Sequence, residues 1–207
     1  MKEALIIGGG SENGRPILDA LLENNFQIIN VGSSAYQKIN ITNILVDWNS
    51  LDIPFVHKQF SQFTGNFDFV FFNQNSSSLN LNDFSLDHDD TLEIWRRIND
   101  WKTSHWLSCQ LPFLVLHTIR KNLNSTSKVG WMLSSYVDYR NEGCSNFADY
   151  SSYKYFNYLS MKSFGLKNQI KTFGIYPDFS GPDSKIKLKQ IISNIVNSNQ
   201  IDTEFRF

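Results

Sequence analysis

Short runs of consecutive apolar residues, separated by segments long enough for helices, recur along the chain. The runs expected to be strands cover residues 4–7, 26–31, 44–46, 67–72, 129–133 and 170–176, with a last edge strand at 203–207. Strands that are apolar throughout are buried on both faces, as in a parallel sheet covered by helices on each side. We therefore predict an α/β fold: one doubly wound domain over residues 1–207, with a parallel sheet of about seven strands.

Apolar residues recur at helical spacing between these runs. The predicted helices cover residues 15–22, 91–123, 149–164 and 184–197. Pro112 is expected to kink or break the long second segment, because proline has no amide hydrogen to give to the preceding turn. Gly165 is the expected C-cap of the third helix and Ser184 the candidate N-cap of the fourth.

The composition argues against several classes of function. Hydrophobic residues make up 41% of the chain, which excludes intrinsic disorder. Lys and Arg number 19 against 20 Asp and Glu, a formal net charge of -1, so no broad basic field attracts nucleic acid or anionic lipid. No apolar run approaches the ~20 residues of a membrane helix. The N-terminal apolar run is too short for a signal peptide, so we expect a cytoplasmic protein.

Metal binding and a disulfide framework are also not indicated. The two cysteines, Cys109 and Cys144, make neither a disulfide framework nor a metal-binding cluster. The four histidines do not have the spacing of metal ligands. We expect no metal site.

The first predicted strand runs directly into glycines that open a helix. Gly8, Gly10 and Gly14 precede Arg15, the first residue of the predicted helix. Glycines let a backbone approach a pyrophosphate closely, and a helix N-terminus offers free N–H groups to the anion. The spacing differs from G-x-G-x-x-G, so a plain strand–turn–helix corner is an equal alternative.

A second candidate site combines a serine, a tyrosine and a lysine. Tyr150 and Lys154 form Tyr-x-x-x-Lys, which places both side chains on one helix face. A lysine ammonium beside a phenol lowers the phenol pKa, so the tyrosine can act as a general acid or base. Ser135 follows a predicted strand, at the edge where parallel sheets bind ligands. In the alternative interpretation Tyr150 packs and Lys154 is solvated.

These features, in this order, resemble the short-chain dehydrogenase/reductase family over residues 1 to about 182, which implies a Rossmann-like fold. Residues 7–15 are similar to the family's Thr-Gly-x-x-x-Gly-x-Gly turn, residues 72–75 to its Asn-Asn-Ala-Gly, and residues 176–179 to its Pro-Gly segment. The resemblance implies a catalytic set of Ser135, Tyr150 and Lys154, with Ser108 in place of the family's asparagine. It implies that the cofactor contacts Gly8, Gly10, Ser11, Asn13, Gly14, Arg15, Asp47, Asn73, Lys154 and Pro177.

The chain also departs from the family pattern. Glu12 stands where the family has its middle glycine, and unless it turns outward its carboxylate repels a pyrophosphate. Asp178 replaces the glycine after the proline. Only thirty residues follow Pro177, so we expect a divergent, C-terminally short relative that lacks the family's substrate-covering helices and terminal Asp-Gly-Gly segment.

The end of the second strand bears on the choice of cofactor. Proteins that bind NAD have an acidic residue there, which binds the ribose hydroxyls of the cofactor. In this chain Gly32 occupies that position. Ser33, Ser34 and Arg15 can instead bind a 2′-phosphate, which favours NADP, with NAD as the alternative. The chain is thus expected to be an oxidoreductase for a small-molecule substrate; a catalytically silent relative that binds a nucleotide or a protein is the other hypothesis.

Aromatic residues are abundant in the segments 91–123 and 150–164. They exceed what one face of a sheet buries, and an exposed apolar patch favours association. The resemblance implies pairing of these two helices, so we expect a homodimer or homotetramer; tryptophans that simply fill the core are the alternative.

Overall fold

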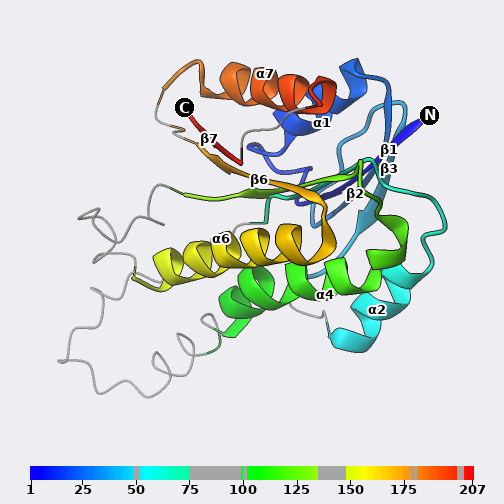
Figure 1. Ribbon diagram of the computed structural model, residues 1–207, viewed down its shortest axis with the longest axis vertical. Coiled ribbons are helices and arrows are strands. Elements are labelled where there is room, and N and C mark those ends of the chain that lie inside the picture. The colour runs from blue at the N-terminus through cyan, green and yellow to red at the C-terminus, as the bar shows by residue number, and fades with distance from the viewer. Residues whose placement is uncertain are drawn as a thin grey trace.

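Seven parallel strands form one sheet in the order β3-β2-β1-β4-β5-β6-β7 (Figure 1). The computed structural model describes residues 1–48, 52–74, 99, 102–134, 148–177, 179, 181–199 and 203–207, and at 148–150 the helix without its side chains. The strands are β1 (Lys2–Ile7), β2 (Phe26–Gly32), β3 (Ile41–Leu45), β4 (Phe69–Phe72), β5 (Lys128–Met132), β6 (Lys171–Tyr176) and β7 (Glu204–Arg206). The order reverses between β1 and β4, which confirms the predicted doubly wound, Rossmann-like sheet.

Helices cover both faces of this sheet (Figure 1). One face carries α1 (Arg15–Glu23) and α7 (Ser184–Asn197), which lie side by side. The other carries α2 (Ile53–Ser61), α4 (Leu111–Thr118) and α6 (Ala148–Asn168). Among the described helices, none combines the length and the apolar character needed to cross a bilayer.

Two apolar cores, one on each face, follow from the alternation of side chains along the strands. In β1, Leu5 and Ile7 join the core under α2, α4 and α6, whereas Ala4 and Ile6 join the core under α1 and α7. All four side chains are fully buried. The continuous apolar runs of the sequence therefore do correspond to strands buried on both faces.

The C-terminal end of α6 and the N-cap of α7 differ from the sequence prediction. The helix α6 does not end at Gly165 but continues to Asn168, and Gln169 then adopts φ 55. Gly165 serves close packing, because a Cβ there would lie 2.5 Å from the hydroxyl of Thr172. The helix α7 begins as predicted, yet its N-cap is Asp183 and not Ser184, whose hydroxyl donates to the Gly181 carbonyl.

The helix α2 was not predicted from the sequence. Asp52 caps it, with its carboxylate accepting from the Phe55 amide at 2.7 Å, and a proline lies in its first turn. Only Val56 and Phe60 are buried along it, so its apolar stripe is short. The proline and the small number of buried apolar residues are why the sequence did not indicate this helix. Its N-cap and its tertiary packing stabilise it.

The segment around Pro112 is a continuous helical path with a local change of pitch. A π-helical turn, η2 (Trp106–Gln110), leads into α4, and a 3₁₀ turn, η3 (Arg120–Asn122), follows it. Pro112 lies in the first turn of α4, where its missing amide is tolerated. The kink or break that we predicted at Pro112 is therefore found as a π turn just before the proline.

Candidate functional site

The glycine-rich turn after β1 is braced by its own side chains and by β4. The Ser11 hydroxyl donates to the Gly8 carbonyl at 3.0 Å and accepts from the Gly14 amide at 3.2 Å. The Asn73 side chain donates to the same carbonyl at 3.0 Å and to the Ser11 hydroxyl at 3.1 Å. Gly8 adopts φ +83, a conformation that favours glycine. Ser11 and Asn73 thus hold the shape of the turn.

Glu12 points away from the interior of this turn. Its carboxylate forms an ion pair with Lys185, in the first turn of α7. A hydrogen bond from Lys185, together with its charge, lowers the pKa of Glu12, and the charge of Arg15 adds to the effect. The structure therefore takes the outward alternative for Glu12, which reduces the repulsion expected against a pyrophosphate.

Gly10 is required by a contact with the loop after β2. A Cβ at Gly10 would lie 1.9 Å from the Ser34 carbonyl oxygen, so that position holds only glycine. The same carbonyl accepts from the Asn30 side chain at 3.3 Å, and Asn30 donates at 2.8 Å to Asn43 of β3. Gly10 thus joins the two loops. From the sequence we expected Gly10 to let the backbone approach a ligand closely. In the structure it is the contact with Ser34 that requires a glycine at this position.

Both loops border one cavity of about 340 Å³ at the carboxyl edge of the sheet. Its lining includes these residues expected from the sequence: Gly8, Gly10, Ser11, Asn13, Ser33, Ser34 and Asn73. Glu12, Gly32, Trp48, Gln74 and Leu107 complete it. The sheet therefore brings five separate segments together at the position where α/β folds bind ligands, and the residues expected from the sequence come from three of them.

The polar groups in this cavity suit a dinucleotide. Asn73 Oδ1 and Gln74 Oε1 are buried and have no hydrogen-bond partner among the described residues. Such acceptors fit the hydroxyl groups of a ribose. The amides of Glu12 and Asn13 donate no hydrogen bond within the described part of the chain and are available to an anion. These donors and acceptors are of the kinds that a diphosphate and a sugar require.

A cationic cluster lies next in sequence to Ser33 and Ser34. Tyr36 lies between two cations: the Arg15 guanidinium is 5.7 Å and the Lys38 ammonium 4.9 Å from its ring centroid. The Tyr36 hydroxyl and Lys38 both donate to Asp19, at 2.9 and 2.7 Å. Asp19 raises the pKa of Lys38, which stays charged. Arg15 does not line the cavity itself but lies beside the loop that does.

Lys154 lies on α6, against the end of β5. It is 3% exposed, and its ammonium donates to the carbonyl of Met132, the last residue of β5, at 2.9 Å. Burial lowers its pKa from the ordinary 10.5 to about 8, against a smaller opposite effect of Cys109. Burial also raises the pKa of the Cys109 thiol to about 11. The alternative of a solvated Lys154 is therefore wrong.

The π turn η2 places Ser108 in the interior. Ser108 is buried, and the Gln74 side chain donates to the carbonyl of Leu107 beside it at 3.1 Å. In a regular α-helix the Ser108 carbonyl would accept from residue 112, which is a proline and has no amide hydrogen. Single π turns occur frequently at functional sites. This turn brings the segment of Ser108 to the same cavity, through Leu107.

Several expected site residues do not line the cavity or lie outside the described residues. Gly14 is buried at the N-cap of α1, Asp47 is exposed after β3, and Pro177 follows β6. Ser135 and Asp178 lie outside the described residues. Tyr150 is in the first turn of α6, four residues before Lys154, and its side chain is not described.

Two lining residues, Trp48 and Gln74, were missed by the sequence analysis. Each follows a residue that we did select, Asp47 and Asn73. The available signal was their position just beyond the carboxyl ends of β3 and β4. Within the described ranges, no group of three potential metal ligands comes together.

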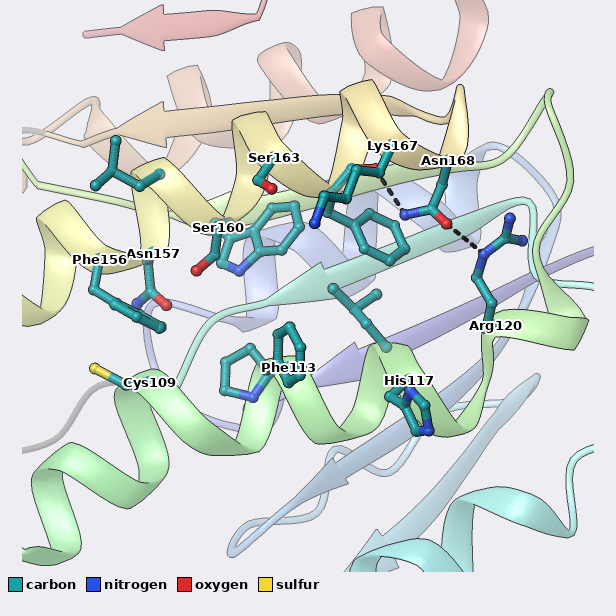
Figure 2. A pocket seen from close by; sticks show the side chains of 15 residues that line it. Cys109, Phe113, His117, Arg120, Phe156, Asn157, Ser160, Ser163, Lys167 and Asn168 are labelled. Carbon is teal, nitrogen blue, oxygen red and sulfur yellow. Dashed lines mark hydrogen bonds between the residues drawn. The ribbon is translucent and has the colours of Figure 1, made fainter.

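A second and larger cavity, of about 450 Å³, contains none of the expected site residues. It is an apolar groove between α4 and α6 (Figure 2). Phe113 and His117 of α4 face Phe156 and Ser160 of α6 across it. Phe113 and Phe156 are exposed in it, and it shares no lining residue with the polar cavity at the sheet edge.

The fold is known from solved structures, whereas the sequence is not close to known proteins. No family model and no curated protein matches the chain. A short-chain dehydrogenase family protein from Francisella tularensis subsp. tularensis SCHU S4 is 21% identical, with a TM-score of 0.68 over 95% of this chain and 77% of its own. A short-chain dehydrogenase/reductase from Serratia marcescens is 14% identical, with a TM-score of 0.76 over 100% of this chain and 95% of its own.

A third similar structure comes from Burkholderia multivorans. This protein, assigned to the short-chain dehydrogenase/reductases and solved with bound NADP, is 14% identical, with a TM-score of 0.66 over 92% of this chain and 90% of its own. The chain has the fold of the short-chain dehydrogenase/reductases.

Proposed function

We propose that the chain is an oxidoreductase that interconverts a carbonyl and an alcohol of a small molecule with a nicotinamide cofactor, NADP in preference to NAD. The observation that carries the proposal is the cavity at the carboxyl edge of the sheet. Residues expected from the sequence to hold the cofactor reach it from three segments that are distant in the chain. Agreement between separate segments is stronger support than one local motif.

Different residues of the cavity would bind different parts of the cofactor. The amides of Glu12 and Asn13 would hold the diphosphate near the start of α1. The side-chain oxygens of Asn73 and Gln74 would accept from ribose hydroxyls. When bound, the nicotinamide would give or take the hydride. Trp48 lines the cavity beside Ser33 and Ser34, so its ring is available for the adenine end.

The proton chemistry is assigned to the chain's own side chains. Lys154, charged at neutral pH with a pKa of about 8, would lower the pKa of Tyr150, one helical turn away. Tyr150 would pass the proton to or from the substrate oxygen, and Ser135 would hold that oxygen by a hydrogen bond. Ser108 takes the place of an asparagine and would hold a water.

The preference for NADP rests on charge beside the loop after β2. No carboxylate stands at the end of β2, where Gly32 lies. Arg15 and Lys38 flank Tyr36 two residues beyond Ser34. A 2′-phosphate there would meet two hydroxyl groups and two cations, of which Lys38 is already paired with Asp19. The neighbour solved with bound NADP supports this choice.

Titration with NADPH and NADH tests the binding half of the proposal. Nucleotide fluorescence and quenching of Trp48 should both saturate, and NADPH should bind more tightly. Trp48→Phe should abolish most of the quenching while leaving the nucleotide signal. Tighter binding of NADH would reject the role given to Arg15 and Lys38.

Turnover is tested with aldehydes and ketones by following NADPH consumption. Tyr150→Phe should abolish turnover and leave the NADPH dissociation constant near that of wild type, since only the proton donor is lost. Tyr155→Phe, an exposed tyrosine on the same helix, is the matched control and should remain active. Equal loss of binding and turnover in Tyr150→Phe would indicate a structural tyrosine.

A second candidate is a catalytically silent relative that binds the nucleotide without turnover. It is favoured by the departures from the family pattern at Glu12, which lines the cavity, at Ser108 and at Asp178. Saturable NADPH binding with no consumption across the carbonyl panel would support this candidate over the enzyme.

We also propose that α4 and α6 pair with the same helices of a second copy, giving a homodimer or homotetramer. Phe113 is 67% exposed and Leu159 48% exposed, and both line the groove between these helices. Burying such side chains stabilises association, because apolar surface leaves water.

A further inference from the structure

Two exposed ion pairs connect α7 with α1 and the turn before it. Lys185 pairs with Glu12, and Lys189, one turn further along α7, pairs with Glu23 at 2.6 Å. The two helices lie side by side on one face of the sheet (Figure 1). Both pairs therefore have the same apparent role in holding α7 against α1.

Only the first of these pairs borders the candidate site. Glu12 lines the cavity together with Gly8, Gly10 and Ser11, whereas Glu23 is at the far end of α1. Lys185 is thereby held at the edge of the turn where an anion would bind. The side chains of Glu12 and Lys185 are 79% and 48% exposed, so water weakens their attraction.

The charges at this position favour exchange of partners. A diphosphate carries more negative charge than one carboxylate and offers several acceptor oxygens to an ammonium. Lysine has a flexible stem and three rotatable donors, so it can change partner without movement of the backbone. Among the described residues, Arg15 lies over the Tyr36 ring, whereas Lys185 is the cation that pairs with a side chain of the turn.

We propose that Glu12 and Lys185 form an exchangeable ion pair, in which Lys185 leaves the Glu12 carboxylate for the diphosphate of an incoming dinucleotide. The inference rests on the proposed function and adds Lys185 as a positioning residue for the cofactor. Before binding, Glu12 keeps the lysine at the cavity rim. After binding, Glu12 keeps its outward direction and is solvated, so a carboxylate is tolerated where a glycine was expected.

The test is the NADPH dissociation constant of four proteins at low and high salt: wild type, Lys185→Gln, Glu12→Gln and the double variant. At low salt Lys185→Gln should weaken binding about fivefold, and Glu12→Gln should strengthen it by a similar factor. Both effects should shrink at high salt because the charges are screened. In the Lys185→Gln background, Glu12→Gln should have a smaller effect, since no lysine is left to release.

The second ion pair provides matched controls. Lys189→Gln and Glu23→Gln remove the same kind of exposed contact between α1 and α7, away from the cavity. They should change the dissociation constant less than about twofold. Thermal unfolding of every variant checks that α7 remains docked.

The outcomes separate this inference from the proposed function. If wild type binds NADPH and Lys185→Gln binds it equally well, the exchange is overturned and the proposed function stands. If the controls weaken binding as much as Lys185→Gln does, the pair only docks α7, which also overturns the exchange. If wild type binds neither NADPH, NADH nor adenosine diphosphate, the proposed function fails and the exchange fails with it.

Discussion

At the scale of single residues, Lys154 combines burial with charge. Its ammonium donates to the Met132 carbonyl, and its burial favours the neutral form. At neutral pH the folded protein therefore keeps Lys154 protonated although burial disfavours its charged form. A residue held at such a cost is a candidate for function, because perturbed pKa values cluster at functional sites.

The pKa of Lys154 predicts how stability depends on pH. The folded state releases the proton near pH 8 and the unfolded state near 10.5, so between these values the unfolded state binds more protons and stability rises with pH. From neutral pH to about pH 10 the gain should be roughly 2 kcal/mol, at about 1.4 kcal/mol per pKa unit. Lys154→Met should remove this gain.

Urea unfolding across this pH range measures the effect. The comparison is best made in a Cys109→Ala background, because the raised pKa of the buried thiol makes stability fall as pH rises from 9 to about 11. Parallel pH curves for the lysine and methionine proteins would show that burial of the Lys154 charge is not the cause.

Gly10 gives a second prediction at this scale. A methyl group at Gly10 would lie 1.9 Å from the Ser34 carbonyl oxygen, so Gly10→Ala should push apart the two loops that border the cavity. We expect a loss of about 2–4 kcal/mol in the free energy of unfolding. Gly181→Ala, with nothing within 4 Å of the added carbon, is the control and should be nearly neutral. Equal stability of the two variants would contradict the close contact.

At the scale of elements, α7 is secured at its C-terminal end by a lysine from the sheet. The Lys128 ammonium donates to the carbonyls of Ile195, Val196 and Ser198 at 2.6, 3.2 and 2.8 Å. These carbonyls lie where a helix leaves its acceptors unsatisfied and its dipole is negative. Burial and the nearby lysines Lys171 and Lys2 lower the pKa of Lys128. The hydrogen bonds compensate for placing the charge there.

Lys128→Met should therefore destabilise the protein by about 1–3 kcal/mol, since it leaves three carbonyls without this donor. Lys171→Met is the control, because Lys171 is exposed and its ammonium donates to one described acceptor, the Asn199 carbonyl, at 2.6 Å. The measurement is the free energy of urea unfolding, together with amide exchange in the last turn of α7. Equal effects of both substitutions would contradict the role of Lys128 as a helix cap.

At the scale of the whole molecule, the groove between α4 and α6 predicts association. Light scattering at micromolar concentration should show twice or four times the 23.9 kDa chain mass. Phe113→Glu and Leu159→Glu should give monomers, because they place charges in the groove. Leu166→Glu is the matched control: Leu166 is 83% exposed on α6 but does not line the groove. A monomeric wild type would reject the oligomer.

The sequence by itself determined the layers of the fold and the segments that meet at the site. Continuous apolar runs such as that of β4 require burial on both faces, which a parallel sheet covered by helices provides. Residues just beyond strand ends then share one edge, so Ser11, Ser33 and Asn73 could be assigned together. These conclusions depend on patterns local to each segment.

Contacts between distant segments were decided only by the tertiary structure. The direction of Glu12 depends on Lys185, which lies 173 residues away, and the need for glycine at position 10 depends on the Ser34 carbonyl. Gly165 appeared to end α6, yet it makes room for Thr172. Burial of Lys154 depends on how α6 packs against β5. The physical reason is that the direction and solvation of a side chain depend on neighbours that only folding brings close. The spacing of residues within one segment of the sequence does not identify these neighbours.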